Sequence, residues 1–135
     1  MMAQIDLKTA TTPALAYLGD CVFELRVRQA LVEAGFSSSK HLNSAALSFV
    51  RAPAQAKAAK IILQVLTEEE EAFFRRGRNM GHTNVPKSAK VSEYRMATGL
   101  EVLMAYLHVA GKNDRIDELF RLGFAEELAA LTENN

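Results

Sequence analysis

The segment from Leu15 to Leu31, LAYLGDCVFELRVRQAL, limits the possible folds of this chain more than any other feature. At about 100° per residue it forms a helix with apolar residues on two nearly opposite arcs. One arc consists of Leu18, Cys21, Val22 and Leu25, and the other of Ala16, Phe23, Val27, Ala30 and Leu31. A domain of this size usually buries only one face of a helix. The pattern therefore predicts a helix that is central or that also contacts a partner subunit.

Signals for β-strands are almost absent from the chain. There is no alternating run of β-branched residues, and no Asn-Gly or Asp-Gly turn separates apolar segments. Ala, Leu, Glu, Lys and Arg dominate instead, as is typical of helices. The 135 residues fit one globular domain. We therefore expect an all-α fold with a single domain over residues 1–135.

Capping residues and glycines divide this expected fold into six helices. The first expected helix covers about 12–35. The second contains 41–50 and has its N-cap among residues 37–39. The others cover about 53–67, 68–78, 91–110 and 114–130. Thr67 and Glu70 match a capping box at the start of the fourth helix. Gly123 is a weak point in the last one.

Asp20 lies at the edge of the second apolar arc, one turn before Glu24. An unpaired carboxylate beside a buried face is strongly destabilising, so Asp20 should bind a cation. Both an arginine and a metal ion are candidates for that cation. The single Cys21 excludes an internal disulfide and a cysteine-built metal site, and we expect it to be a small core residue.

A second carboxylate, Glu101, lies on an otherwise apolar helix. Its neighbours one turn away are small, namely Ala97, Thr98 and Ala105, so another backbone can come close. Two interpretations remain open at this level. Asp20 and Glu101 could meet across a helix contact and jointly bind Mg²⁺, which takes oxygen ligands. Alternatively, each could form a buried salt bridge, with Arg95 or Arg26 as the partner.

Positive charge is concentrated between Ala72 and Ser92, a stretch without an acidic residue in a chain of zero formal charge. The five basic residues there are Arg75, Arg76, Arg78, Lys87 and Lys90. Most of this stretch, from Arg76 to Lys90, is expected to be a loop, and its length makes it a functional candidate. Arginine forks and glycine-containing backbone suit phosphate contacts, and binding should then weaken steeply with salt. The alternative is a solvated loop whose cations offset the preceding run of four glutamates.

Other common sites are not indicated. His41, His82 and His108 have no spacing typical of a zinc site, and there is no serine-nucleophile motif. No charge-free apolar run is long enough for a membrane span, so we expect a cytoplasmic protein without a membrane partner.

Four stretches together resemble the Mini-III ribonucleases, the compact members of the ribonuclease III class. They are AYLGDCVFELRVRQAL, HLNSAALSFVRAPAQAKA, RRGRN and VPKSAKVSEYRMATGLEVLMAYLHV. The resemblance implies a ribonuclease III endonuclease domain-like helical bundle that forms homodimers and cleaves double-stranded RNA with Mg²⁺. It also implies that no separate double-stranded-RNA-binding domain is present, so that the basic segment supplies much of the RNA contact.

The resemblance also implies roles for individual residues. Asp20 and Glu101 would be the catalytic, metal-binding carboxylates, and RNA contacts are expected from Arg75, Arg76, Arg78, Asn79, Lys87 and Lys90. Larger ribonuclease III enzymes have two further acids, at the positions of Ala16 and Thr98. Mini-III enzymes resemble this chain in both substitutions, which reduce the ligands available for a second metal ion. Glu24 could reach the metal through water or could pair with an arginine.

The function implied by the resemblance is hydrolysis of phosphodiester bonds by a metal-activated water, giving 5′-phosphate and 3′-hydroxyl ends. The implied substrate is the precursor of large-subunit (23S-type) ribosomal RNA, with a large-subunit ribosomal protein as a further partner. Two alternatives are a catalytically inactive RNase-III-like module that binds RNA or the ribosome, and a helical protein-interaction domain. Retention of both Asp20 and Glu101 favours the nuclease.

Overall fold

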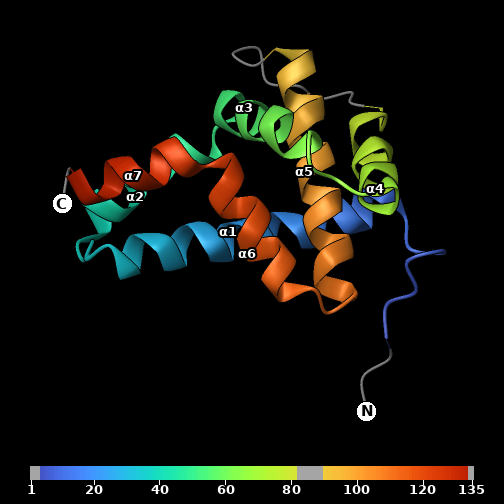
Figure 1. Cartoon of the computed structure of the whole chain (residues 1–135), viewed down its shortest axis with the longest axis horizontal. Helices are drawn as coiled ribbons and strands as arrows, with labels where there is room; N and C mark the ends of the chain where they lie inside the picture. Colours follow the sequence, from blue (N-terminus) through green and yellow to red (C-terminus); the bar gives the residue numbers. More distant parts are fainter. Residues whose placement is uncertain (1–3, 82–89, 134–135) are drawn as a thin grey trace.

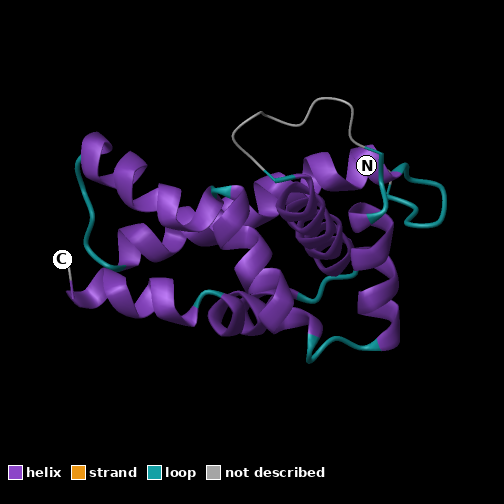
Figure 2. Ribbon diagram, turned by 90° about the horizontal axis from the view of Figure 1, so that it is seen from above, coloured by secondary structure: helices purple, strands orange, loops and turns teal. Residues whose placement is uncertain are grey.

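The computed structural model describes residues 4–81 and 90–133. In these ranges the chain forms seven helices and no strand, which confirms the all-α prediction (Figures 1 and 2). The helices are α1 (Thr12–Glu33), α2 (Ser39–Val50), α3 (Ala52–Leu63), α4 (Glu68–Arg78), α5 (Val91–Val109), α6 (Asn113–Gly123) and α7 (Ala125–Glu133). None of the described helices combines the length and apolar character that a bilayer-spanning helix requires.

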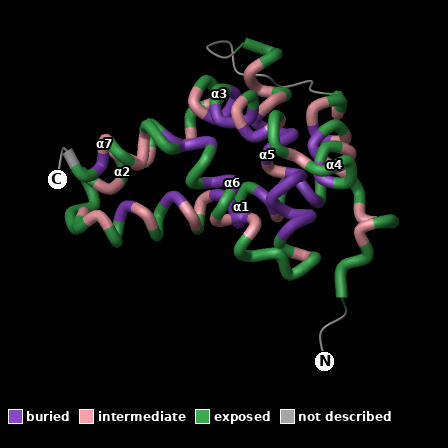
Figure 3. Tube along the Cα trace, in the orientation of Figure 1, coloured by how far each residue is buried: buried purple, intermediate pink, exposed green. Residues whose placement is uncertain are grey.

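Helix α5 is the centre of the molecule. It contacts α1, α3, α4 and α6, and it crosses α1 in Figure 1. Between Ala97 and Leu107 every residue except Glu101 is buried, as the colouring of Figure 3 illustrates for this helix. A helix that is apolar on all sides is stable only when other helices surround it. The half-buried carboxyl group of Glu101 is therefore an exception in the core.

Glycine allows α4 to approach this central helix closely. A Cβ atom on Gly77 would lie 2.6 Å from the carbonyl oxygen of Thr98 and 2.8 Å from the Cα atom of Gly99. Real Cβ atoms essentially never approach other atoms so closely, so a larger side chain would push the two helices apart.

Of the two apolar arcs predicted for α1, the second lies in the core and most of the first does not. On the second arc Phe23, Val27 and Leu31 are buried against the helices around α5. On the first arc only Val22 is buried, whereas Leu25 is 56% exposed. The prediction that Cys21 belongs to the core is wrong, because its side of α1 faces away from α5 and is exposed.

The last predicted helix is two helices in the structure. α6 ends at Gly123 and α7 begins at Ala125, so the break falls beside the glycine singled out in the sequence. A Cβ atom on Gly123 would lie 2.7 Å from Ile62 Cδ1. The absence of a side chain at this position therefore lets α6 pack closely against α3. Phe124 is fully buried and packs against Phe23, Phe49 and Phe120. Burial of Phe124 in this aromatic cluster accounts for the break between α6 and α7.

The predicted ranges of the fourth helix, 68–78, and of the following loop, 76–90, overlap, and the structure assigns the overlap to the helix. Arg76 and Arg78 lie in the last turn of α4, which extends to Arg78 and is capped by Asn79. The capping box of Thr67 and Glu70 at the other end of α4 is confirmed by both of its hydrogen bonds. Residues 82–89, with His82 and Lys87, lie outside the described residues.

Candidate active site

Asp20 and Glu101 are brought together where α1 contacts α5. The residue before Asp20 is Gly19, whose missing side chain leaves room for the α5 backbone. A Cβ atom at Gly19 would overlap with the carbonyl oxygen of Glu101, so only glycine permits this contact. The two carboxyl groups lie close enough to interact, and both line one pocket.

The two carboxyl groups have different environments. Asp20 is exposed, whereas Glu101 is half-buried on the core helix. Burial of the Glu101 carboxyl, together with the neighbouring Asp20 carboxylate, raises the pKa of Glu101 to about 8. At neutral pH the protonated form of Glu101 is therefore favoured.

The salt-bridge alternative is not supported by the described residues. Arg26 pairs with Asp117, with Nε 2.7 Å from Oδ1, so its pairing with Asp20 or Glu101 is wrong. Arg95 is exposed, and within residues 4–81 and 90–133 neither Asp20 nor Glu101 forms an ion pair with it or with another cation.

Glu24 is directed to a different partner. Its Oε2 lies 3.6 Å from Nη2 of Arg28, one turn further along α1. Of the two possibilities left by the sequence, the structure contains the arginine pair. Such exposed pairs contribute little to stability.

The paired carboxyls open into a pocket of about 720 Å³. Its other walls come from the end of α2, the start of α3 and one face of α5, including Arg51, Gln55 and Tyr94. In the described part of the chain no cluster of three or more His, Cys, Asp or Glu side chains could enclose a metal ion. Mg²⁺ is typically held by one or two carboxylates, with waters and substrate phosphates completing its coordination. Two adjacent carboxyls that form no ion pair with a described residue, in a pocket with room for water and phosphate, fit this ion.

Residues 13–112 match the family described as Ribonuclease III domain. The chain belongs to this family. A Mini-ribonuclease 3 from Enterococcus faecalis is 41% identical over 116 residues, which cover 84% of this chain and 88% of that protein. A Mini-ribonuclease 3 from Symbiobacterium thermophilum is 42% identical over 107 residues, which cover 79% and 82%. These matches also confirm the resemblance to the Mini-III group.

A solved structure has a similar arrangement of helices. The crystal structure of a Fusobacterium nucleatum protein superimposes with a TM-score of 0.80 at 27% sequence identity. The match covers 93% of this chain and 99% of that one. The helical arrangement of this chain is therefore shared with that protein over nearly the whole of both chains.

The basic residues expected to contact RNA have different surroundings in this family member. Arg75 is exposed, with Nη1 3.7 Å from Oε1 of Glu71. Arg78 Nε donates to Oδ1 of Asn79 at 3.4 Å. Lys90 is exposed at the start of α5, and Lys87 lies outside the described residues. Contact between these residues and RNA stays a prediction.

Arg76 differs from the other arginines of α4 because the partners of its guanidinium lie in a distant segment of the chain. Nη2 donates to the carbonyl oxygen of Ala10 at 3.0 Å and to Oγ1 of Thr12 at 3.3 Å. The guanidinium also lies 5.4 Å from the centre of the Phe73 ring. Arg76 therefore connects α4 to the segment before α1, and its contact with RNA stays a prediction.

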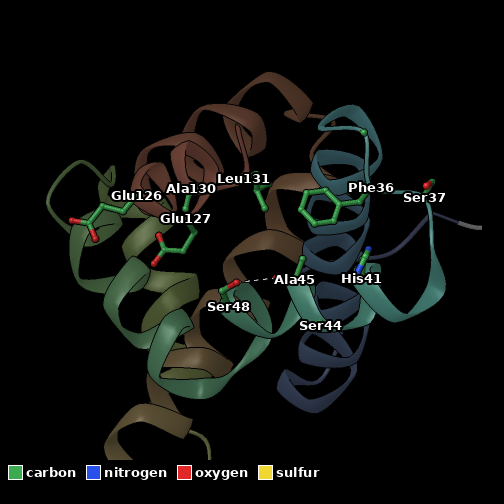
Figure 4. A pocket seen from close by; sticks show the side chains of 11 residues that line it. Phe36, Ser37, His41, Ser44, Ala45, Ser48, Glu126, Glu127, Ala130 and Leu131 are labelled. Atoms are coloured by element: carbon green, nitrogen blue, oxygen red, sulfur yellow. Dashed lines mark hydrogen bonds between the residues drawn. The ribbon is translucent and has the colours of Figure 1, made fainter. Parts of the chain in front are cut away.

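A second pocket of about 640 Å³ lies between α2 and α7 (Figure 4). It shares no lining residue with the carboxylate pocket. Its two acids, Glu126 and Glu127, are both paired with Lys57. Because these carboxylates already have a cationic partner, this pocket does not resemble the metal site proposed for Asp20 and Glu101.

The residue that sequence reasoning missed is Arg51. It lines the carboxylate pocket although it lies far from Asp20 and Glu101 in the sequence. No local spacing could have revealed this position, because it depends on the angle between α2 and α3 and on their packing against α5.

Proposed function

We propose that this endoribonuclease cleaves double-stranded RNA by Mg²⁺-assisted hydrolysis at Asp20 and Glu101. The observation that carries the proposal is the close approach of these two carboxyls at the junction of α1 and α5, where neither forms an ion pair with a described residue. Family membership supports ribonuclease chemistry at this position.

Different residues of the chain have different roles in this mechanism. When bound, Mg²⁺ would neutralise charge on a backbone phosphate and lower the pKa of a coordinated water. Asp20 and Glu101 would hold the ion, and Glu101 must lose its proton to do so. Gly19 fixes the distance between the two carboxyls, because it allows the α1 and α5 backbones to touch.

RNA contact is proposed for the C-terminal end of α4 and the segment that follows. Arg75, Arg78 and Asn79 are accessible to different degrees on this end, and Lys90 is exposed where the chain enters α5. A-form RNA is recognised mainly by its shape, its phosphates and its 2′-hydroxyls. Charged and polar side chains on one end of a helix suit such recognition without reading base sequence.

A homodimer is proposed because α1 keeps an exposed apolar stripe. Tyr17 is 86% exposed, Leu25 is 56% exposed and Val32 is 64% exposed, and all three lie on the same side of the helix as Cys21. Exposed apolar stripes of this kind mark protein interfaces. Two symmetry-related copies of the site would then be available to cut the two strands of one duplex.

The proposed substrate is the precursor of large-subunit ribosomal RNA, in the cytoplasm, with a large-subunit ribosomal protein as a further partner. The support for these points is the similarity to Mini-ribonuclease 3 proteins, which extends over most of the chain.

The Asp20→Asn variant tests the catalytic assignment. It removes one metal ligand and leaves the side chain almost the same size, so the fold should be preserved while cleavage of a structured precursor RNA falls by at least about 100-fold. The measurement is the rate of cleavage with Mg²⁺ and with EDTA, with the new ends mapped by sequencing.

Glu33→Gln is the matched control, because Glu33 is an exposed carboxylate on the same helix. It should cleave like the parent protein. Undiminished cleavage by Asp20→Asn would refute the assignment. RNA binding without any cleavage by the parent protein, under conditions where Mg²⁺ is saturating, would favour the inactive RNA-binding alternative.

A further inference from the structure

The carboxylate pocket has an electrostatic problem as an RNA site. Asp20 and Glu101 are acidic, and every backbone phosphate of RNA is negatively charged. One metal ion offsets part of this repulsion, but the neighbouring phosphates also need cationic partners. Among the described residues that line the pocket, Arg51 is the only basic side chain.

The backbone of Arg51 is held by two helices. It is the C-cap of α2 and the N-cap of α3, with φ −67° and ψ 146°. Its N–H donates to the carbonyl oxygen of Leu47 at 3.4 Å, and its carbonyl accepts the N–H of Gln55 at 3.0 Å. The point from which the guanidinium extends is therefore fixed relative to the pocket.

Gln55 strengthens this corner. It is only 7% exposed, and its Nε2 donates to the carbonyl oxygen of Val50 at 2.9 Å. Gln55 and Val50 line the same pocket as Arg51. A buried side chain thus ties α3 to the end of α2 directly beside the arginine.

The guanidinium of Arg51 is available for a ligand. Arg26 and Arg115 use their guanidinium groups in ion pairs within the chain. The Arg51 side chain is exposed and forms no hydrogen bond or ion pair with residues 4–81 or 90–133. Although Arg51 is the N-cap residue of α3, its side chain makes no capping hydrogen bond, so the first N–H groups of this helix add positive potential at the same wall of the pocket.

We propose that Arg51 is a phosphate-binding residue of the active site, and that its guanidinium holds a backbone phosphate of the RNA next to the scissile one. The proposal rests on the proposed function of Asp20 and Glu101. An arginine binds phosphate oxygens through two parallel N–H groups, so it orients the phosphate as well as attracting it. Arg51 would thereby place the strand across the metal site.

The first experiment measures binding without cleavage. Duplex RNA is titrated onto Asp20→Asn protein with and without the additional Arg51→Ala change, at several salt concentrations. Loss of one phosphate contact should weaken binding and reduce the slope of log affinity against log salt by about one. Arg51→Lys keeps the charge and should retain the slope.

The second experiment measures cleavage by proteins that retain Asp20. We expect Arg51→Ala to lower kcat/KM by about 10- to 100-fold, and Arg51→Lys to lie between Arg51→Ala and the parent, because lysine lacks the bidentate fork. Arg121→Ala is the matched control, since Arg121 is an exposed arginine on α6 that does not line this pocket. It should match the parent in both experiments.

The outcomes separate this proposal from the proposed function. If Arg51→Ala keeps the parent's salt slope and kcat/KM while Asp20→Asn is inactive, the role of Arg51 is refuted and the nuclease assignment stands. An equal loss in Arg121→Ala would also refute it, because the effect would not belong to the pocket. If Asp20→Asn remains active, the proposed function fails, whatever the behaviour of Arg51.

Discussion

Two carboxyl groups of the same chemistry have opposite environments in the proposed active site. Asp20 is exposed on α1, whereas Glu101 interrupts an otherwise buried run on α5. Because Glu101 is partly removed from water and lies beside Asp20, its charged form is disfavoured and its pKa rises to about 8. A metal ligand in this position therefore destabilises the metal-free protein.

Replacement of Glu101 by Gln should stabilise the metal-free protein in a pH-dependent way. Below the ordinary pKa of 4.5 the carboxyl is protonated in both the folded and the unfolded chain, so the variant should gain nothing. Between pH 4.5 and about 8 the unfolded chain loses this proton first, and stability of the parent falls. We expect the variant to exceed the parent by about 1–3 kcal/mol at pH 8.

The measurement is the free energy of unfolding in EDTA across this pH range. Glu33→Gln controls for the loss of a carboxylate as such, because Glu33 is exposed. A difference between Glu101→Gln and the parent that stays constant with pH, or that shrinks as pH rises, would contradict the explanation.

At the scale of elements, α4 has a structural end and a functional end. Its N-terminus is held by the capping box and by Arg115 of α6, whose Nε and Nη2 donate to Glu70 at 2.9 Å and 2.8 Å. Glu70 is only 3% exposed. The C-terminus of α4 carries Arg75 and Arg78, which are proposed to contact RNA. Fixing one end of the helix positions the other.

Arg115→Ala should therefore be strongly destabilising. It leaves the buried Glu70 carboxylate without its partner, and such losses typically cost about 3–5 kcal/mol. The hydrogen bond from Arg115 is the main cause of the lowered pKa of Glu70. The stabilisation is present above the unfolded pKa of 4.5 and is lost as the pH falls through the lower folded pKa, so the variant and the parent should converge in acid.

Denaturant unfolding at pH 7 and at pH 3 checks this expectation. The control is again Arg121→Ala on the same helix, which should change stability by less than about 0.5 kcal/mol. A variant Arg115→Ala as stable as this control at pH 7 would show that α4 does not depend on the ion pair.

At the scale of the whole molecule, the exposed apolar stripe of α1 is the surface through which the homodimer is proposed to form. Leu25 is at its middle, between Cys21 and Val32. Leu25→Glu would place a charge against the same surface of a second copy, so the protein should become monomeric in sedimentation at micromolar concentration. Burying an unpaired charge in an interface is far more costly than exposing it.

Leu122→Glu is the control for this change, because Leu122 is also an exposed apolar residue, 39% exposed, but lies on α6. It should sediment like the parent. A parent protein that is itself monomeric, or a Leu25→Glu protein that remains dimeric, would contradict the proposed interface. The monomer should also cut the two strands of a duplex independently, which two-colour strand labelling can measure.

Much of the fold and part of the site could be predicted from local patterns. Helix ranges, the capping box of Thr67 and Glu70, and the weak point at Gly123 depend on side chains within a few residues of one another. Asp20 and Glu101 stood out because each carboxylate interrupts an apolar helix.

Other features were decided by tertiary packing alone. Helix periodicity placed Cys21 on an apolar arc, but only the position of α5 on the opposite side leaves this cysteine exposed. Arg76 reads as one of a basic group, but the path of the chain before α1 brings carbonyl groups to its guanidinium. A local pattern of residue types does not predict which distant segment of the chain will contact a given side chain.

The sequence by itself thus determined most of the helices, and it identified Asp20 and Glu101 as two carboxylates on apolar helices that could form one site. The tertiary structure decided that Asp20 and Glu101 meet, that Arg26 is engaged by Asp117, and that Arg51 lines their pocket. The physical reason is that helix formation follows from contacts three or four residues apart. A site between helices depends on crossing angles and close approaches, such as that of Gly19 to α5, which are set by the packing of the whole core.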